Sequence, residues 1–399
     1  MSNSYVLVIN SGSSSLKFAV IDSKSGDALV SGLGECFGLP EAVISWKYQG
    51  QKTEEAIPAG GNHHKYAVNR VVALLETLGL SSKFVAVGHR IVAGGETFKE
   101  TVRVNESVIA DVESLAELAP LHNKANAAGM RAAMEAFPNL PQFAVFDTAF
   151  HQTMPEKAFV YALPYELYQE HKVRRYGAHG TSHYYVSREA AKAINKPVEE
   201  SNFITVHLGN GASVSAIKNG QCIDTSMGLT PLAGLMMGTR CGDLDPSVIE
   251  FLFRKGWKQE ELFEMLNKKS GFLGVSGITS DARGVLEAMD NGNPRAKLAF
   301  DIFTYRVAKY IGSYMVAIGE EVDAIVFTGG IGENSLPIRS EILKYLKVFG
   351  YQEDEVGNAA ARFGQSGTVT TADSKLAMVI PTNEELVIVS QSMELLRQQ

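Results

Sequence analysis

The chain has 399 residues, of which 45% are apolar and 20% charged, the balance of a folded globular protein rather than a disordered or fibrous one. This length exceeds the size at which one hydrophobic core usually stops growing, so two domains are expected. The net charge of -7 and the absence of a basic stripe exclude a nucleic-acid-binding protein, and no apolar run in the sequence has the length of a membrane span.

Three cysteines, Cys36, Cys222 and Cys241, are too few and too widely spaced to build a disulfide framework or a zinc site. Such sparse cysteines are typical of proteins from a reducing compartment. The N-terminus enters a strand-like segment at once, without the basic segment and apolar core of a secretion signal. We therefore expect a cytoplasmic protein.

Short β-rich runs alternate with longer segments of helical period, which is the pattern of an α/β protein. The expected strands are, in chain order, 5–9, 84–87, 142–146, 203–208, 324–328 and 376–380. The expected helices are 68–78, 187–194, 246–254, 260–266 and 294–318. Asn293 is placed as the cap of the last helix, and Pro294 at its first position.

A weak internal repeat connects residues 5–20 (YVLVINSGSSSLKFAV) with residues 204–220 (ITVHLGNGASVSAIKNG). In both segments an apolar strand meets a turn of small residues and a second strand follows, with Ser14 aligned to Ser213. Two halves of similar design would explain this. Because glycine and serine mark most hairpins, these segments alone support duplication and coincidence equally.

Three turns rich in small residues accompany the strands, at 10–17, 207–211 and 328–334. Small residues leave backbone N–H groups uncovered, and these groups can surround phosphate oxygens. The first turn adds a cation, Lys17. The sequence contains neither the Walker motif G-x-x-x-x-G-K-[ST] nor the dinucleotide motif G-x-G-x-x-G, which argues against a dehydrogenase. One such turn is a weak signal, whereas three favour a nucleotide site that handles phosphate.

Residues 6–18 (VLVINSGSSSLKF) and 145–151 (VFDTAFH) resemble the two signature segments of the acetate kinase family. Further family motifs follow in the family's order and spacing: His89-Arg90, 119–123 (APLHN), 175–183 (RYGAHGTSH), 207–211 (HLGNG), 237–240 (MGTR), 281–283 (DAR) and 329–334 (GGIGEN). The resemblance covers essentially the whole chain. The combination is specific, although each fragment alone is not.

The resemblance implies the fold shared by acetate and sugar kinases, actin and the large heat-shock chaperones. That fold is α/β, with two duplicated ribonuclease H-like domains whose mixed sheets are flanked by helices, and ATP bound in a cleft between them. The implied domains are residues 1–146 plus 386–399, with the first phosphate turn and the acyl-substrate residues, and residues 147–385, for nucleotide binding and dimerisation. A homodimer is implied as well.

The implied reaction is reversible: ATP and acetate give ADP and acetyl phosphate, with Mg²⁺, or Mn²⁺ in its place. The acceptor carboxylate is already ionised at neutral pH, so it needs no general base. Cations must instead surround the transferring group, because an anion approaches a polyanion. By its motif, Arg90 would bind acetate or acetyl phosphate. Arg240 and His179 would stabilise the phosphoryl oxygens in transit, and Asp147 would orient an arginine or the cation.

The resemblance also assigns binding residues. Asn10 and Glu384 match the magnesium positions and would hold the ion largely through water. Residues 382–385 also resemble a helix capping box, in which Glu385 returns to Thr382 and Glu384 favours the helix dipole, and this interpretation is compatible with the metal role. The acyl methyl would lie against Val92, Leu121 and Pro231, the phosphates against Lys17, His207, Leu208, Gly209, Asn210 and Gly211, and adenosine against Asp281, Ala282, Arg283, Gly329, Gly330, Ile331, Gly332 and Glu333.

Two residues depart from the family pattern: Ala93 stands where many members have histidine, and Ala178 where some have phenylalanine. A small side chain at 178 would widen the acyl pocket, which keeps a propionate or butyrate kinase open. From a different class, a chaperone-like or actin-like protein that uses ATP to change shape is the alternative, although such chaperones carry a further client-binding domain.

Overall fold

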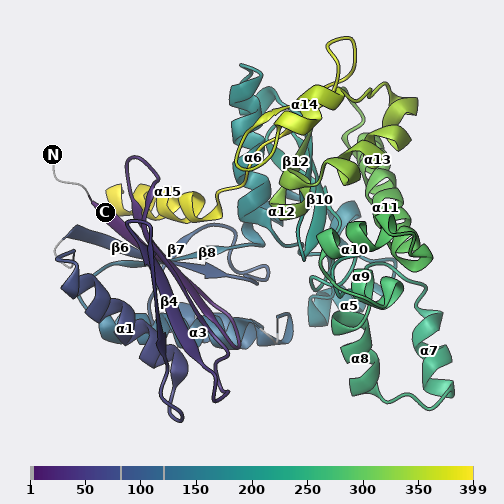
Figure 1. Cartoon of the computed structure of the whole chain (residues 1–399). Helices are drawn as coiled ribbons and strands as arrows, with labels where there is room; N and C mark the ends of the chain where they lie inside the picture. The colour runs from purple at the N-terminus through teal and green to yellow at the C-terminus, as the bar shows by residue number, and fades with distance from the viewer. Residues whose placement is uncertain (1–3, 81–82, 120–121, 399) are drawn as a thin grey trace. The chain divides into compact units, whose positions relative to one another are not determined.

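The computed structural model describes residues 4–80, 83–119 and 122–398, and the chain forms two compact units (Figure 1). Unit 1 comprises Met1–Ala149 and Asn383–Gln399, and unit 2 comprises Phe150–Thr382. None of the described helices is long and apolar enough to cross a membrane.

Unit 1 is built on an eight-stranded sheet in the order β5-β4-β3-β2-β1-β6-β8-β7. Its elements are β1 (Tyr5–Ser11), β2 (Leu16–Asp22), β3 (Ala28–Glu35), β4 (Val43–Tyr48), β5 (Gln51–Ala56), α1 (His63–Thr77), β6 (Phe84–Ile91), β7 (Val102–Arg103), α2 (Glu106–Ser114), η2 (Leu115–Glu117), α3 (Asn123–Ala136), β8 (Gln142–Phe146) and α15 (Glu384–Arg397). β1 pairs antiparallel with β2 and parallel with β6, which in turn pairs parallel with β8.

Alternation along β1 explains how both faces of this sheet are covered. Leu7 and Ile9 point to one face and belong to a core shared with α1 and α3. Val6 and Val8 point to the other face, where they pack in a core with Ile388 of α15. Figure 1 shows α15 on one side of the sheet, with α1 and α3 on the other.

Unit 2 is built on a six-stranded sheet in the order β11-β10-β9-β12-β14-β13. Its elements are η3 (Ala149–Thr153, which begins in unit 1), α4 (Glu156–Phe159), α5 (Tyr165–His171), α6 (Gly180–Ala193), η4 (Val198–Glu200), β9 (Phe203–Leu208), β10 (Ala212–Lys218), β11 (Gln221–Thr225), α7 (Ser247–Arg254), α8 (Gln259–Lys268), α9 (Gly271–Ser276), α10 (Ala282–Asp290), α11 (Pro294–Ile318), β12 (Ala324–Thr328), α12 (Gly329–Asn334), α13 (Leu336–Leu346), η5 (Lys347–Phe349), α14 (Glu355–Ala360), β13 (Gly367–Thr368) and β14 (Ala377–Val379). α6 packs on one face of the sheet, and α11 and α13 share the core on the other.

The two sheets share a central topology. In unit 2, β10 is antiparallel to β9, and β9, β12 and β14 are parallel neighbours. In unit 1, β2 is antiparallel to β1, and β1, β6 and β8 are parallel neighbours. A further antiparallel strand extends each sheet, β11 beside β10 and β3 beside β2. The two sequence segments of the weak repeat form β1–β2 and β9–β10, which are equivalent hairpins. The duplication that the sequence left open is therefore confirmed.

Helix α11 begins where the sequence predicts. The Asn293 side chain accepts hydrogen bonds of 3.0 Å from the backbone N–H groups of Arg295 and Ala296, and Pro294 occupies the first turn. Such a cap stabilises a helix by about 1 kcal/mol. Gly319 caps the C-terminal end of the helix, with a φ of 66° that glycine adopts much more readily than other residues.

Three predictions about the later part of the chain need correction. The cap of α15 is Asn383, whose side chain accepts from Leu386 N at 3.0 Å, and not Thr382. Glu385 does not return to the cap, because its carboxylate binds Lys17. Residues 329–334, expected as a turn, form the short helix α12.

The crossings between the units also differ from the predicted boundaries. The chain leaves unit 1 after Ala149 and returns at Asn383. Asp147 and Glu384 thus lie in unit 1 and not in the C-terminal domain. The physical reason is local: Asp147 N donates to Ile91 O at 2.9 Å and so continues the pairing of β8 with β6, while Asn383 belongs to α15 as its cap.

Candidate active site

In unit 1 the predicted residues gather where β6 and β8 end. Arg90 lies near the end of β6 and Asp147 directly follows β8, its parallel neighbour. Arg90 Nη2 lies 2.6 Å from Asp147 Oδ2, and the side chains are 24% and 2% exposed. Burial alone would lower the pKa of Arg90, but Asp147 and Glu384 outweigh it and raise that pKa. The guanidinium is therefore a permanent and oriented cation.

The N-terminus of α15 is tied to the same end of the sheet. Glu384 Oε2 lies 3.7 Å from Arg90 Nε, and Lys17 Nζ lies 2.7 Å from Glu385 Oε1. Burial would raise the pKa of Glu385, but the bond to Lys17 reverses this and lowers it. Asn10 faces Lys17 across the β1–β2 hairpin. The structure thus brings these predicted metal, phosphate and acyl residues of unit 1 together.

Asn10 and Glu384 supply an amide oxygen and a carboxylate, the hard oxygen donors that Mg²⁺ and Mn²⁺ accept. Among the described residues, no group of three or more His, Cys, Asp and Glu side chains is placed to hold a metal ion. A cation held by this pair therefore needs water or phosphate for its remaining ligands. That is the usual situation of magnesium beside a nucleotide, so the donor set fits the ion.

Two buried asparagines to which the sequence analysis gave no role hold the segment in which Val92 is predicted to bind the acyl methyl. On α3, Asn126 Oδ1 accepts from Val92 N at 3.1 Å and Asn123 Oδ1 accepts from Ala93 N at 3.2 Å. What distinguishes these asparagines is that their amides are buried in a helix that packs on a sheet. A single sequence does not show burial, so it could not have identified them. Leu121 lies outside the described residues.

In unit 2 the predicted residues surround the turn between β9 and β10. A Cβ on Gly211 would lie 3.3 Å from Arg240 Nη2 and 3.3 Å from His179 Nε2. Glycine at this position therefore lets two nitrogen groups converge beside the exposed backbone of the turn. This is the arrangement that an anion with several oxygens requires.

Arg240 has no compensating charge in the part of the chain that the structure describes: no carboxylate there forms an ion pair with it. Its Nη1 donates to the carbonyl oxygen of Pro231 at 2.7 Å. Burial lowers the pKa of Arg240, and no acidic neighbour offsets this. A partly buried guanidinium keeps its proton, so its charge is available to an anionic ligand.

His179 stands at the N-terminus of α6 with φ 56° and ψ 24°, the left-handed conformation. Few residues other than glycine adopt it, and it costs about 1–2 kcal/mol. The His179 ring stacks on that of His207 at a centroid distance of 4.3 Å. His179, which the sequence predicts to be catalytic, is thus one of the non-glycine residues with a strained backbone.

The β9–β10 turn also contacts two further predicted segments. Gly329 of residues 329–334 approaches so closely that a Cβ there would lie 2.7 Å from Leu208 O, and its φ of 76° also favours glycine. On the other side, Gly238 of residues 237–240 donates its N–H to Asn210 O at 3.0 Å, and a Cβ on Gly238 would lie 3.1 Å from Ser280 O. With His179 of residues 175–183, residues from three other predicted motifs therefore adjoin this turn.

Glu333 has an internal partner set. Its Oε1 accepts from Gly329 N at 3.0 Å, from Thr328 Oγ1 at 3.3 Å and from Thr382 N at 3.0 Å. The carboxylate therefore fixes the start of α12, and its Oε1 is occupied by these internal hydrogen bonds. Asp281 similarly caps α10, accepting from Arg283 N at 2.9 Å, and forms an exposed ion pair with the Arg283 side chain at 2.7 Å.

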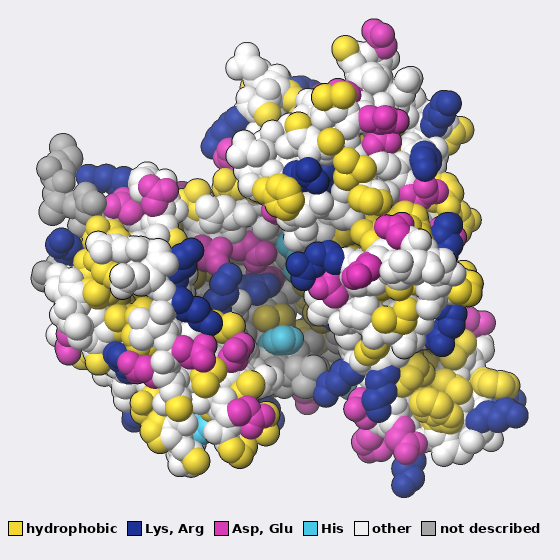
Figure 2. All heavy atoms as spheres, in the orientation of Figure 1, with side chains coloured by type: hydrophobic (Ala, Val, Ile, Leu, Met, Phe, Trp, Pro, Cys, Tyr) yellow, Lys and Arg dark blue, Asp and Glu magenta, His cyan; other side chains and the backbone are white. Residues whose placement is uncertain are grey.

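A different surface of unit 2 is strongly apolar. None of the residues of α7 is buried, although five of its eight are apolar, and three of these five, Val248, Phe251 and Phe253, are exposed. Phe251 is 50% exposed, and Phe263 of α8 is 45% exposed. Figure 2 shows hydrophobic side chains gathered over α7 and α8, at the lower right of the view.

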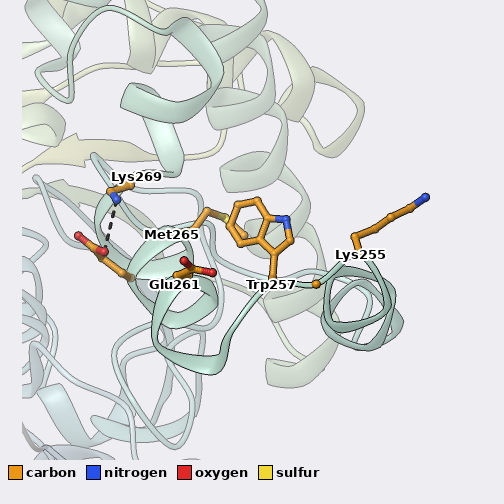
Figure 3. Close-up of a pocket in the computed structure, with 7 residues that line it drawn as sticks. Lys255, Trp257, Glu261, Met265 and Lys269 are labelled. Carbon is orange, nitrogen blue, oxygen red and sulfur yellow. Dashed lines mark ion pairs between the residues drawn. The ribbon is translucent and has the colours of Figure 1, made fainter.

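A cavity of about 510 Å³ opens beside this surface, between the end of α7 and α8. Its lining residues are Lys255, Gly256, Trp257, Glu261, Glu264, Met265 and Lys269. Figure 3 shows Met265 directed toward the Trp257 indole, while Lys255 points away. Glu264 and Lys269 form an ion pair of 3.3 Å. None of the predicted site residues lines this cavity, so it is not the candidate active site.

Comparison with known proteins finds one family across this chain. The sequence model of the acetokinase family matches residues 5–390. A relative from Vibrio cholerae, "Acetate kinase 2", is 71% identical over 99% of this chain and 100% of its own length. "Acetate kinase" from Shewanella baltica is 57% identical over the same shares.

Two solved structures are similar throughout. An acetate kinase from Porphyromonas gingivalis has a TM-score of 0.92 and 43% identity, over 98% of this chain and 100% of its own. A propionate kinase from Francisella tularensis subsp. tularensis also has a TM-score of 0.92 and 43% identity, over 97% of this chain and 98% of its own.

Proposed function

This chain belongs to the acetokinase family, and on that premise we propose that it transfers the γ-phosphoryl group of ATP to acetate, giving acetyl phosphate and ADP. The observation that carries the proposal is the convergence of Arg240 Nη2 and His179 Nε2 at Gly211. Arg240 brings a charge that no described carboxylate neutralises, beside the glycine turn between β9 and β10. Together they suit the equatorial oxygens of a phosphoryl group in transfer.

The acid is bound by Arg90 in this proposal. Its carboxylate partner Asp147 is almost fully buried, so Asp147 orients the guanidinium and is not available as a base. None is needed, because a carboxylic acid with a pKa of about 4 to 5 is ionised at neutral pH. We assign Val92 and Pro231 to contact with the acyl methyl. Leu121 has the same assignment on the basis of the sequence motif alone.

Asn10 and Glu384 would hold Mg²⁺ or Mn²⁺, largely through water. When bound, the cation neutralises phosphate charge and so lowers the repulsion between ATP and the acid. Lys17 and the backbone of residues 207–211 would bind the phosphates. Residues 281–283 and 329–333 would frame adenosine, with Glu333 acting through the backbone that it holds.

Hydroxamate trapping of acyl phosphate tests this function. The wild-type chain with ATP, Mg²⁺ and acetate is expected to form acetyl hydroxamate, and Arg240→Ala is expected to lose at least about 100-fold in kcat while its circular dichroism spectrum is unchanged. A wild-type enzyme that hydrolyses ATP without forming acyl phosphate would instead be an ATP-driven conformational protein. Full activity in Arg240→Ala would contradict the role of that residue.

The choice of acid is part of the same assay. One similar solved structure is a propionate kinase, and Ala178 removes a ring that some family members carry at this position. One methylene in an apolar pocket changes specificity by only about 1–3 kcal/mol. We expect propionate to be a slower substrate than acetate. A higher kcat/KM for propionate would reassign the enzyme as a propionate kinase.

The proposal includes a homodimer formed through α7 and α8, in a cytoplasmic enzyme. It is supported by the amphipathic helix α7, in which Val248, Phe251 and Phe253 are exposed in the part of the chain that the structure describes. Exposed apolar patches of this kind mark interfaces. We choose a second copy of the chain as the partner that covers this surface, because it is present in every preparation of the protein.

A further inference from the structure

A chain of hydrogen bonds leads from His179 into the core of unit 2. His179 Nδ1 lies 2.9 Å from Ser213 Oγ, which lies 2.7 Å from His183 Nε2. His183 Nδ1 lies 2.7 Å from Thr205 Oγ1. Ser213, His183 and Thr205 are fully buried, whereas His179 is partly exposed. One end of the chain therefore reaches the candidate site and the other ends in the core.

The secondary structure makes this arrangement rigid. His183 lies one helical turn after His179 on α6, so both rings face the hairpin on which α6 packs. Thr205 lies on β9 and Ser213 on β10, in a hairpin whose register pairs Ser213 with His207. These hydrogen bonds join one helix to two strands, and the side chains of Ser213 and His183 in the middle have no solvent contact.

The directions of these bonds are coupled. Burial lowers the pKa of His183 well below its usual range, with a further contribution from His151 and His207, so His183 is neutral. A neutral imidazole has one N–H and one acceptor nitrogen, and serine has one O–H. If Ser213 donates to His179 Nδ1, it must accept from His183 Nε2, and Thr205 then donates to His183 Nδ1.

We propose that Ser213 is a positioning residue of the phosphoryl transfer, which together with His183 keeps the hydrogen of neutral His179 on Nε2, the atom that converges with Arg240 at Gly211. The inference rests on the proposed function. The hydrogen bond at one ring nitrogen decides which tautomer the other nitrogen presents. With the opposite tautomer, a bare Nε2 lone pair would face the phosphoryl oxygens and repel them.

The pH dependence of a variant separates this role from simple packing. The charged or titratable groups that the described contacts place near His179 include Arg240 at Gly211, the stacked His207, and His183 through Ser213. When His179 is doubly protonated, both of its nitrogens carry hydrogen and Ser213 no longer decides the tautomer. Loss of the serine hydroxyl should therefore matter only where His179 is neutral.

Ser213→Ala is the test, and Ser215→Ala is its matched control. Ser215 is also fully buried on β10, but its hydroxyl bonds to Thr225 Oγ1 at 2.8 Å instead of to histidine. At about pH 8, where an ordinary imidazole is neutral, Ser213→Ala should lose about 10- to 100-fold in kcat for acetyl phosphate formation. The KM values should change little, and the loss should shrink at any pH low enough to protonate His179 doubly. Ser215→Ala should follow the wild type.

An equal loss in both variants, or a loss in Ser213→Ala that is the same at every pH, would overturn the proposal. Nitrogen-15 chemical shifts of the wild-type histidines, with His179 assigned by His179→Asn, test it without any need for Ser213→Ala to fold. A hydrogen on Nδ1 of His179 at about pH 8 would also overturn it. Failure of the proposed function is distinguishable, since the wild type would then form no acyl phosphate or Arg240→Ala would retain full activity.

Discussion

At the scale of single residues, the two arginines of the candidate site differ in what neutralises them. Arg90 binds a buried carboxylate at 2.6 Å and lies 3.7 Å from a second one. Among the described residues, Arg240 donates a hydrogen bond to a neutral group, the carbonyl oxygen of Pro231. The first arginine is therefore fixed in orientation, whereas the second keeps a charge that a phosphoryl group can neutralise.

Removal of the Asp147 charge should show how much the first pair contributes. In Asp147→Asn the shape is kept, but Arg90 loses its nearest counter-charge in a site that is 2% exposed on the aspartate side. We expect unit 1 to lose about 2–4 kcal/mol in its free energy of unfolding, measured in urea, and kcat to fall at least about 100-fold.

The Lys17–Glu385 pair is a control for that measurement. Its side chains are 59% and 31% exposed, so solvent screens the attraction. Glu385→Gln should change the free energy of unfolding by less than about 1 kcal/mol. A stability loss in Glu385→Gln as large as that in Asp147→Asn would show that burial does not set the strength of these pairs.

His89 should make the stability of unit 1 depend on pH. Burial lowers its pKa to about 4, although the hydrogen bond to Gln142 at 2.8 Å opposes this. The unfolded chain binds a proton near pH 6.5, where the folded chain does not. Stability is therefore complete above about pH 6.5 and is lost as the pH falls toward about 4, by up to about 1.4 kcal/mol per pH unit.

Urea unfolding of the wild type and His89→Gln at pH values between about 7 and 4.5 checks this expectation. The variant has no imidazole at this position, so its stability should fall less steeply on acidification. Parallel curves for the two proteins would show that His89 does not titrate differently in the folded and unfolded chains.

At the scale of elements, α12 shows how one carboxylate organises a glycine-rich segment. Glu333 Oε1 accepts three hydrogen bonds that fix Thr328, Gly329 and Thr382. Glu333→Ala should raise the KM for ATP about tenfold, the equivalent of one charged hydrogen bond, and should speed amide exchange at Gly329 and Thr382. Glu333→Gln keeps an acceptor oxygen and should recover most of the affinity. Unchanged KM and exchange in Glu333→Ala would refute this role.

The elements that could be predicted are those with a strong local signal. β8, β9 and β12 were predicted with their bounds, and α11 with its cap, because buried strands are short apolar runs and Asn-Pro marks a helix start. α12 was expected as a turn, because three glycines disfavour a helix and the stabilising contact of Glu333 with Thr382 joins residues far apart in sequence.

Site residues divide in the same way. Arg90, Asp147, His179 and Arg240 could be selected because they lie in motifs of a known family. His183 also lies in such a motif, but neither His183 nor Ser213 was assigned a role, since their roles depend on contacts between α6 and β10 that local sequence does not encode. The cap of α15 was wrong by one residue because Thr382 and Asn383 are both good caps and tertiary contacts decide between them.

At the scale of the whole molecule, the exposed residues of α7 predict the state of assembly. Phe251→Glu places a charge on the apolar surface of α7 and α8, and should shift the protein from dimer to monomer in analytical ultracentrifugation. Phe363→Glu is the control, since Phe363 is 75% exposed but lies outside α7 and α8. A wild type that sediments as a monomer, or equal dissociation in both variants, would contradict the proposed interface.

The closure of the unit 1 sheet by α15 has a consequence for synthesis. A ribosome completes unit 2 before it makes residues 383–399, whose helix covers Val6 and Val8. β1 therefore waits with one apolar face open until α15 arrives. Unit 2 can fold while it is being made, but unit 1 can finish only after the helix is released, and the nascent chain is vulnerable to aggregation through that sheet in the interval.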